Sequence, residues 1–270
     1  LTFSGSGEMD NGWTVSVSNT LINGGTSGLG MTLDMGDAGS LNYEADTGQR
    51  GVGKIRDMLP SADEGFDNGM DSNGTNTGGG VSGRVSGGAS GFHYSKAMDM
   101  FEIGIGWAPK GGSTNGSGGV TGAGAGASAT SAFVKIDPMD GLEIGFGTGE
   151  KAVASTANTN DHQTMYVTYV YGPVTVGYQE SEKETYTAAE TDDEATRWGV
   201  LYAVNDEVSI SYQTHENNDT TATDEDATGW SASYTVGSMT FKAHRNKGTN
   251  LGNVASRSSE RTELGVTFAF

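Results

Sequence analysis

The chain has 270 residues, a formal net charge of −19 and a hydrophobic content of 34%, with 44 Gly, 4 Pro and no Cys. This acidic excess argues against nucleic acid as a partner, because phosphate binding needs clustered Lys and Arg. Without Cys, disulfides and thiolate metal sites are excluded. No run approaches the ~20 apolar residues of a membrane-spanning helix, and the first residues hold no signal region. We expect one domain, residues 1–270, in mature form if the protein is exported.

Apolar and polar residues alternate with a period of two along most of the chain, which is typical of β-strands. Trp13, Val15 and Val17 share one face of the first clear run. Tight turns such as Gly172-Pro173 and Gly237-Ser238 separate later runs. We expect the connections to alternate strictly between two or three residues and ten or more. The pattern predicts about fifteen strands of roughly ten residues, a length that suits strands crossing a bilayer at a tilt.

The pattern favours an all-β fold, a transmembrane antiparallel up-and-down β-barrel. The polar face of the strands is rich in Ser, Thr, Gly and charge, which suits a water-filled interior and not the dry core of a β-sandwich. Tyr and Trp lie toward strand ends, as in interfacial girdles, although ordinary β-propensity is the alternative explanation. Closure would also remove the exposed edges of so wide a sheet. A soluble β-sandwich or surface-layer protein is the non-membrane alternative.

Residues 44–87 break this alternation for some forty residues. A connection of this length is uncommon in a compact protein and is usually functional or disordered. Its first thirty residues carry seven acids and three bases, a net charge of −4: Glu44, Asp46, Asp57, Asp63, Glu64, Asp67 and Asp71 against Arg50, Lys54 and Arg56. The composition of this loop therefore predicts a negative local potential.

The C-terminal residues ELGVTFAF, with apolar residues at alternate positions and the terminal aromatic Phe270, resemble the closing strand of bacterial outer-membrane general-diffusion porins. These are sixteen-stranded, trimeric barrels in which a long loop after the fifth strand folds into the lumen. Here the long loop follows the fourth visible strand. Because a single-chain barrel needs an even number of strands, we expect one more strand before Leu1. The resemblance implies barrel closure at Phe270, the outer membrane of a Gram-negative bacterium, contact with lipid and lipopolysaccharide, and a homotrimer.

The resemblance also implies that residues 44–87 form the pore constriction. Carboxylates in a narrow pore favour cations, so we expect a cation-preferring channel for ions and small hydrophilic solutes. The family commonly places Arg and Lys on the facing wall, but the early strands of this chain have no inward base. Candidate wall bases occur elsewhere: Arg84, Lys135, Arg197, Lys242 and His244, with Arg261 closer to a rim position.

Glycines form pairs at inward positions of two predicted strands, Gly104/Gly106 and Gly145/Gly147. They either leave room for the loop to lie against the wall or allow the strands to curve. These two interpretations have equal weight at the level of sequence.

Other functions have weaker support. Oxygen ligands such as Asp67, Asp71 and Asn73 suit Ca²⁺, but no fixed spacing is present and a solvated acidic loop is the better interpretation, so we expect no required cofactor. No nucleophile elbow, HExxH or P-loop occurs, so we do not expect an enzyme. The alternatives on the same fold are a solute-selective channel and a barrel-anchored adhesin or structural protein.

Overall fold

The computed structural model describes residues 1–22, 25–45, 51–55, 57–63, 91–109, 128–152, 159–185, 191–219, 223–251 and 254–269. Most of them belong to one antiparallel sheet of 15 strands. The strands are β1 (Thr2–Glu8), β2 (Thr14–Ile22), β3 (Gly25–Asp34), β4 (Ser40–Ala45), β5 (Gly91–Met98), β6 (Phe101–Ala108), β7 (Ala129–Met139), β8 (Leu142–Ala152), β9 (Thr159–Tyr171), β10 (Val174–Thr185), β11 (Thr191–Ala203), β12 (Val208–Asp219), β13 (Glu225–Val236), β14 (Met239–Thr249) and β15 (Ser259–Phe268). Two short 3-10 helices are η1 (Gly36–Ala38) and η2 (Gly51–Ile55).

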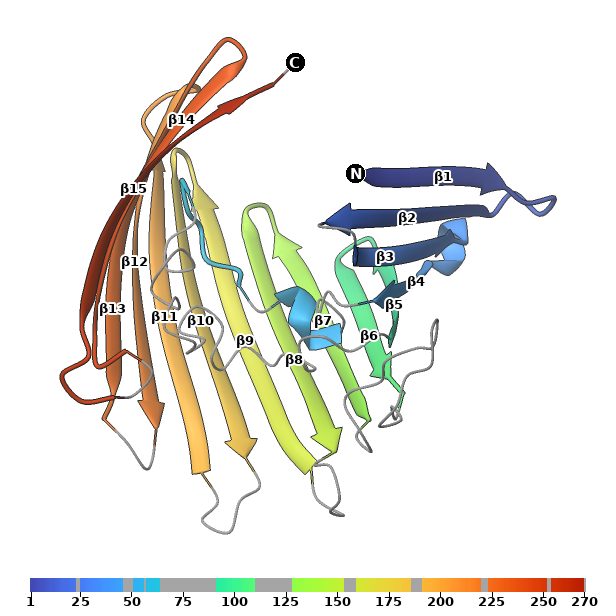
Figure 1. Ribbon diagram of the computed structural model, residues 1–270, viewed down its shortest axis with the longest axis horizontal. Coiled ribbons are helices and arrows are strands. Elements are labelled where there is room, and N and C mark those ends of the chain that lie inside the picture. Colours follow the sequence, from blue (N-terminus) through green and yellow to red (C-terminus); the bar gives the residue numbers. More distant parts are fainter. Residues whose placement is uncertain are drawn as a thin grey trace.

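Each strand pairs with the next one in sequence, so the sheet is an up-and-down meander from β1 to β15. The sheet is open, with β1 and β15 at its two edges (Figure 1). The predicted strand number and the position of the long loop between β4 and β5 are confirmed. The extra strand expected before Leu1 stays a prediction. Within the described ranges, no helix has the length and apolar character needed to span a membrane.

The connection lengths differ from the expected strict alternation. Two connections expected to be turns of two or three residues are longer and comprise residues 9–13 and 35–39. After β8, the connection at residues 153–158 is shorter than expected. Strands β9 to β13 extend through polar sequence, and the backbone of Asp192 and Asp193 belongs to β11. Backbone pairing continues there although the apolar alternation has ended.

Most apolar and aromatic side chains of the strands project to one face of the sheet, which we call the outer face. Large side chains such as Ile105, Phe146 and Trp230 are exposed there. Trp198, Tyr212 and Trp230 form a row across β11, β12 and β13, with ring centroids 5.4 and 4.5 Å apart. So extensive an apolar surface is typical of contact with lipid or with another subunit.

Acidic side chains replace the apolar ones on the outer face toward the long connections. The register places Glu182 opposite Glu194 and Glu216 opposite Asp226, and all four residues are exposed. Like charges directly opposite each other in a sheet repel, which lowers the stability of this end of the strands.

We expect Glu194→Lys to raise the unfolding temperature at low salt, because it replaces the repulsion with Glu182 by an opposite-charge pair. Salt at about 1 M should abolish the gain, since exposed charges are then screened. Thermal unfolding in detergent at two salt concentrations measures this. Glu8→Lys is the matched control, because exposed Glu8 lies opposite Thr14 and opposes no acid. Equal gains in the two variants would contradict the prediction.

Candidate functional site

Residues 51–55 and 57–63, which we call the inner segment, lie on the face of the sheet opposite the outer face (Figure 1). The backbone N–H of Gly51 donates to Nδ1 of His93 on β5 at 3.0 Å. At the other end, the N–H of Asp63 donates to Oγ of Ser231 on β13 at 3.1 Å. The inner segment thus crosses most of the width of the sheet, and we call the face it covers the inner face.

Gln179 on β10 holds the middle of the inner segment. Its Oε1 accepts a hydrogen bond from the N–H of Met58 at 3.0 Å, and its Nε2 donates to the carbonyl of Ile55 at 2.8 Å. The same Nε2 donates to Oγ1 of Thr164 at 3.1 Å, and Gln179 is only 1% exposed. The amide therefore satisfies backbone groups that the irregular segment cannot pair within itself.

We expect Gln179→Leu to loosen the inner segment, because the buried carbonyl of Ile55 loses its partner at a cost of about 1–3 kcal/mol. Limited proteolysis should cut the segment faster, and the unfolding midpoint should fall. Gln163→Leu is the matched control, because Gln163 on β9 is exposed on the outer face. Identical cleavage rates in Q179L and Q163L would contradict the role of Gln179.

Glycines on the inner face make room for the inner segment. A Cβ atom added to Gly147 would lie 2.7 Å from Cγ2 of Val52 and 2.9 Å from Cδ1 of Ile55. At Gly177 it would lie 2.5 Å from Cδ of Pro60. The room expected at Gly147 is therefore used by the loop. The equivalent role of Gly177 was not predicted.

Two further glycines of the predicted pairs, Gly104 and Gly145, are covered by aromatic rings of neighbouring strands. A Cβ atom at Gly104 would lie 2.1 Å from Cε1 of Phe133, and one at Gly145 would lie 2.0 Å from Cε1 of Tyr166. These rings join the buried apolar cluster beneath η2, which also contains Val52. The cluster is small because most of the inner face is polar.

The end of the inner segment carries an ion-pair network with β14 and β15. Asp63 contacts Nζ of Lys242 at 3.1 Å and Nδ1 of His244 at 3.0 Å. Nε2 of His244 lies 3.5 Å from a carboxylate oxygen of Glu263. The Lys242 side chain is 41% exposed and that of Asp63 is 13% exposed. The structure thus brings together three of the predicted site residues, Asp63, Lys242 and His244.

Each of the remaining described wall bases has a partner in the barrel wall. Lys135 pairs with Glu102 at 2.5 Å. Arg197 is 6% exposed, and its Nε donates to Nδ1 of His215 at 3.0 Å. Arg261 pairs with Glu263. Strand alternation places Lys135 and Arg197 on the inner face as expected, but it does not reveal the partner of each base.

The exposed charges of the inner segment are Lys54 and Asp57. Several predicted site residues lie outside the described residues: Asp46, Arg50, Arg56, Glu64, Asp67, Asp71, Asn73, Arg84 and Phe270. Glu44 belongs to β4, but its side chain lies outside the described residues. The Ca²⁺ site at Asp67, Asp71 and Asn73 therefore stays a prediction.

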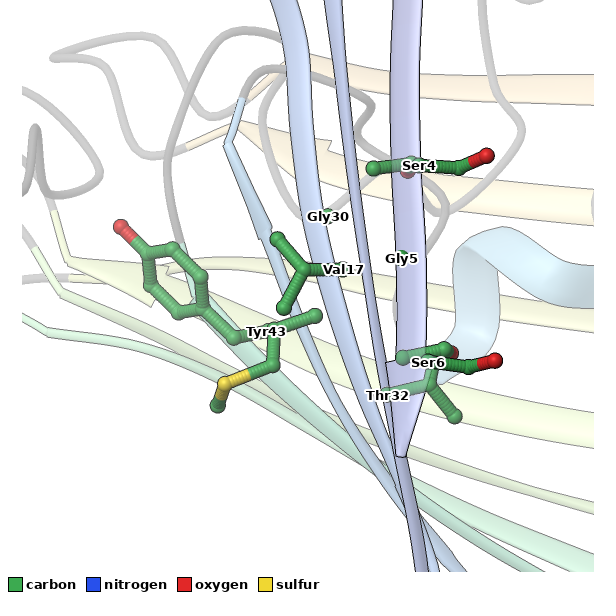
Figure 2. A pocket seen from close by; sticks show the side chains of 10 residues that line it. Ser4, Gly5, Ser6, Val17, Gly30, Thr32 and Tyr43 are labelled. Carbon is green, nitrogen blue, oxygen red and sulfur yellow. The ribbon is translucent and has the colours of Figure 1, made fainter. Parts of the chain in front are cut away.

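The inner face of β1 to β4 is lined by hydroxyl groups. Ser4, Ser6 and Thr32 project to one side of the strands and Tyr43 to the other (Figure 2). Residues from both sides of these strands, including the three hydroxyl residues and Tyr43, border a hollow of about 450 Å³. The Thr32 hydroxyl donates to Oδ1 of Asn42 at 2.6 Å. As predicted, the described inward positions of these four strands carry no base.

A wide up-and-down sheet with an apolar outer face, a polar inner face and an inward-folded segment defines the class of β-barrel channels. The family model described as Gram-negative porin matches residues 1–235. The chain belongs to the Gram-negative porin family and is an outer-membrane porin channel, as the C-terminal resemblance implied.

Solved structures support the fold. A porin refined at 1.8 Å resolution shares 15% identity with the chain at a TM-score of 0.75, over 100% of this chain and 91% of that one. An anion-selective porin from Comamonas acidovorans shares 12% identity at a TM-score of 0.68, over 100% and 89% of the two chains. The trimer form of OmpT from Vibrio cholerae shares 15% identity at a TM-score of 0.61, over 98% and 88%. No curated protein matches the chain.

Proposed function

We propose that the channel passes ions and small hydrophilic solutes by passive diffusion, between the inner segment and the hydroxyl-lined wall of β1 to β4. The observation that carries this proposal is the fixation of the inner segment across the inner face, from His93 on β5 to Lys242 on β14. A segment that is held at both ends and in the middle narrows the passage to a constant width. The proposal includes residues 44–87 as the constriction of a single barrel domain.

We further propose that the channel prefers cations. Lys135 and Lys242 are each paired with a carboxylate, so their fields are largely neutralised. Residues 44–73 have an excess of acids over bases. Because fields in a narrow pore are screened less than in bulk water, this excess should attract cations.

Planar-bilayer recording in a KCl gradient tests both parts. We expect an ohmic current and a reversal potential on the cation side. Absence of current from inserted protein would favour the adhesin or structural alternative. A reversal potential on the anion side would show that bases dominate the passage. Block of the current by one class of solute alone would favour the solute-selective channel.

We also propose a homotrimer embedded in outer-membrane lipid and lipopolysaccharide. The trimer form of OmpT supports the assembly, and the exposed apolar outer face supplies a surface for contact between subunits or with lipid. Native mass spectrometry in mild detergent should report three chains. A monomer under conditions that preserve the current would contradict the trimer.

A further inference from the structure

Strands β8, β9 and β10 separate their charges by face on the side of the inner segment toward the long connections. Inward positions on this side, among the described residues, carry bases and neutral groups but no acid: Gly149, Lys151, Asn160, His162, Thr164, Ser181 and Lys183. Outward positions of the same strands carry exposed acids: Glu150, Asp161, Glu182 and Glu184. Neighbouring residues of a strand point to opposite faces, so each acid lies next in sequence to a base or to His162 on the other face.

The inward bases gather around His162. The register pairs His162 with Lys183 on β10 and Asn160 with Lys151 on β8. Diagonal neighbours on one face of a sheet are within reach of long side chains. Both lysines act electrostatically on the His162 ring, as does Asp161 from the outer face.

His162 is 7% exposed, and its Nδ1 has no hydrogen-bond partner among the described residues. A buried polar nitrogen without a partner is costly, and such atoms in native proteins often mark a missing ligand or water. Two ammonium groups beside it make an anionic oxygen a better complement than a neutral one.

The cluster of Lys151, His162 and Lys183 lies between the level of the inner segment and the long connections. Gly147 and Gln179 contact the inner segment, and Lys151 and Lys183 follow four positions further along the same strands. At about 3.3 Å per residue, the lysines are roughly 13 Å from the level of the inner segment. A solute would meet them in the vestibule before it reaches the narrowest part.

We propose that Lys151, His162 and Lys183 form a subsite for the carboxylate or phosphate group of a small anionic solute entering the vestibule. The subsite deepens the proposed function, on which it rests, by naming a solute class. Cation preference at the constriction is compatible with it, because the two regions lie about a Debye length apart at 0.1 M salt. The backbone register places Asp193 of β11 opposite Lys183.

Calorimetric titration of detergent-purified protein with inorganic phosphate tests the subsite at constant ionic strength. We expect saturable binding to the unaltered protein and an affinity at least tenfold lower for K151Q/K183Q. Each single variant, K151Q or K183Q, should weaken binding about threefold, which keeps the test decisive if the double variant does not fold. Glu182→Gln, on the outer face of β10, should leave the affinity unchanged.

Two results would overturn the subsite: no saturable binding to the unaltered protein, or the same affinity in the lysine variants and in E182Q. This measurement is independent of current. Failure of the channel function would appear as absent conductance, whereas failure of the subsite would appear as absent phosphate binding in a protein that conducts.

Discussion

Replacing Gly177 with Val is expected to push the inner segment away from the wall and to lower the single-channel conductance. The added Cβ would lie 2.5 Å from Cδ of Pro60, and the proline ring cannot rotate aside as a flexible side chain can. Relief to van der Waals contact needs a shift of about 1 Å into the passage. Overpacking of this kind costs about 1–3 kcal/mol, so the unfolding midpoint should fall as well.

Gly265→Val is the matched control for this substitution. Gly265 on β15 lies opposite Lys242, and a Cβ atom there would meet nothing within 4 Å. Bilayer recordings and urea unfolding of both variants measure the effect. A conductance of G177V equal to that of G265V would show that the contact with Pro60 does not position the inner segment.

Replacing Asp63 with Ala is expected to move the reversal potential toward anions. The substitution removes the carboxylate that neutralises Lys242, and the ammonium group then faces the lumen with 41% of its side chain exposed. Breaking a fully buried pair costs about 3–5 kcal/mol, and the exposure of Lys242 makes the loss here smaller. His244, which also contacts Asp63, loses the same partner.

Glu260→Gln is the matched control, because it removes one acid from an exposed pair with Arg245. It should not move the reversal potential. The double variant D63A/K242A should shift it back toward cations, and the cycle isolates the contribution of the pair. An unchanged reversal potential in D63A would show that Asp63 and Lys242 do not act on permeating ions.

The strands were predictable because their apolar and polar residues alternate. The signal was strong where one face meets lipid, as for Trp13, Val15 and Val17. It was lost in the halves of β10 and β11 toward the long connections, where polar residues such as residues 179–184 occupy both faces. There the backbone ladder continues without an apolar pattern, so strand ends and connection lengths were mispredicted.

The location of the candidate site was predictable, but its contacts were not. The interruption of alternation at residues 44–87 indicated a loop with its own role. Inward Gly147 was compatible with room for the loop and equally with strand curvature. The hydrogen bonds of Gln179 depend on the path of a segment that has no period. The pairing of Lys242 with Asp63 likewise joins residues whose separation in sequence gives no signal of contact.

The wall supplies the side chains that anchor the inner segment, while the segment supplies mainly backbone atoms. Gln179 binds the N–H of Met58 and the carbonyl of Ile55, and Ser231 binds the N–H of Asp63. Backbone groups are the same in every residue except proline. We therefore expect that the charge of exposed positions such as Asp57 can be changed while the path of the segment is kept. If the segment is the constriction, as proposed, replacing this short peptide would alter permeation without rebuilding the barrel wall.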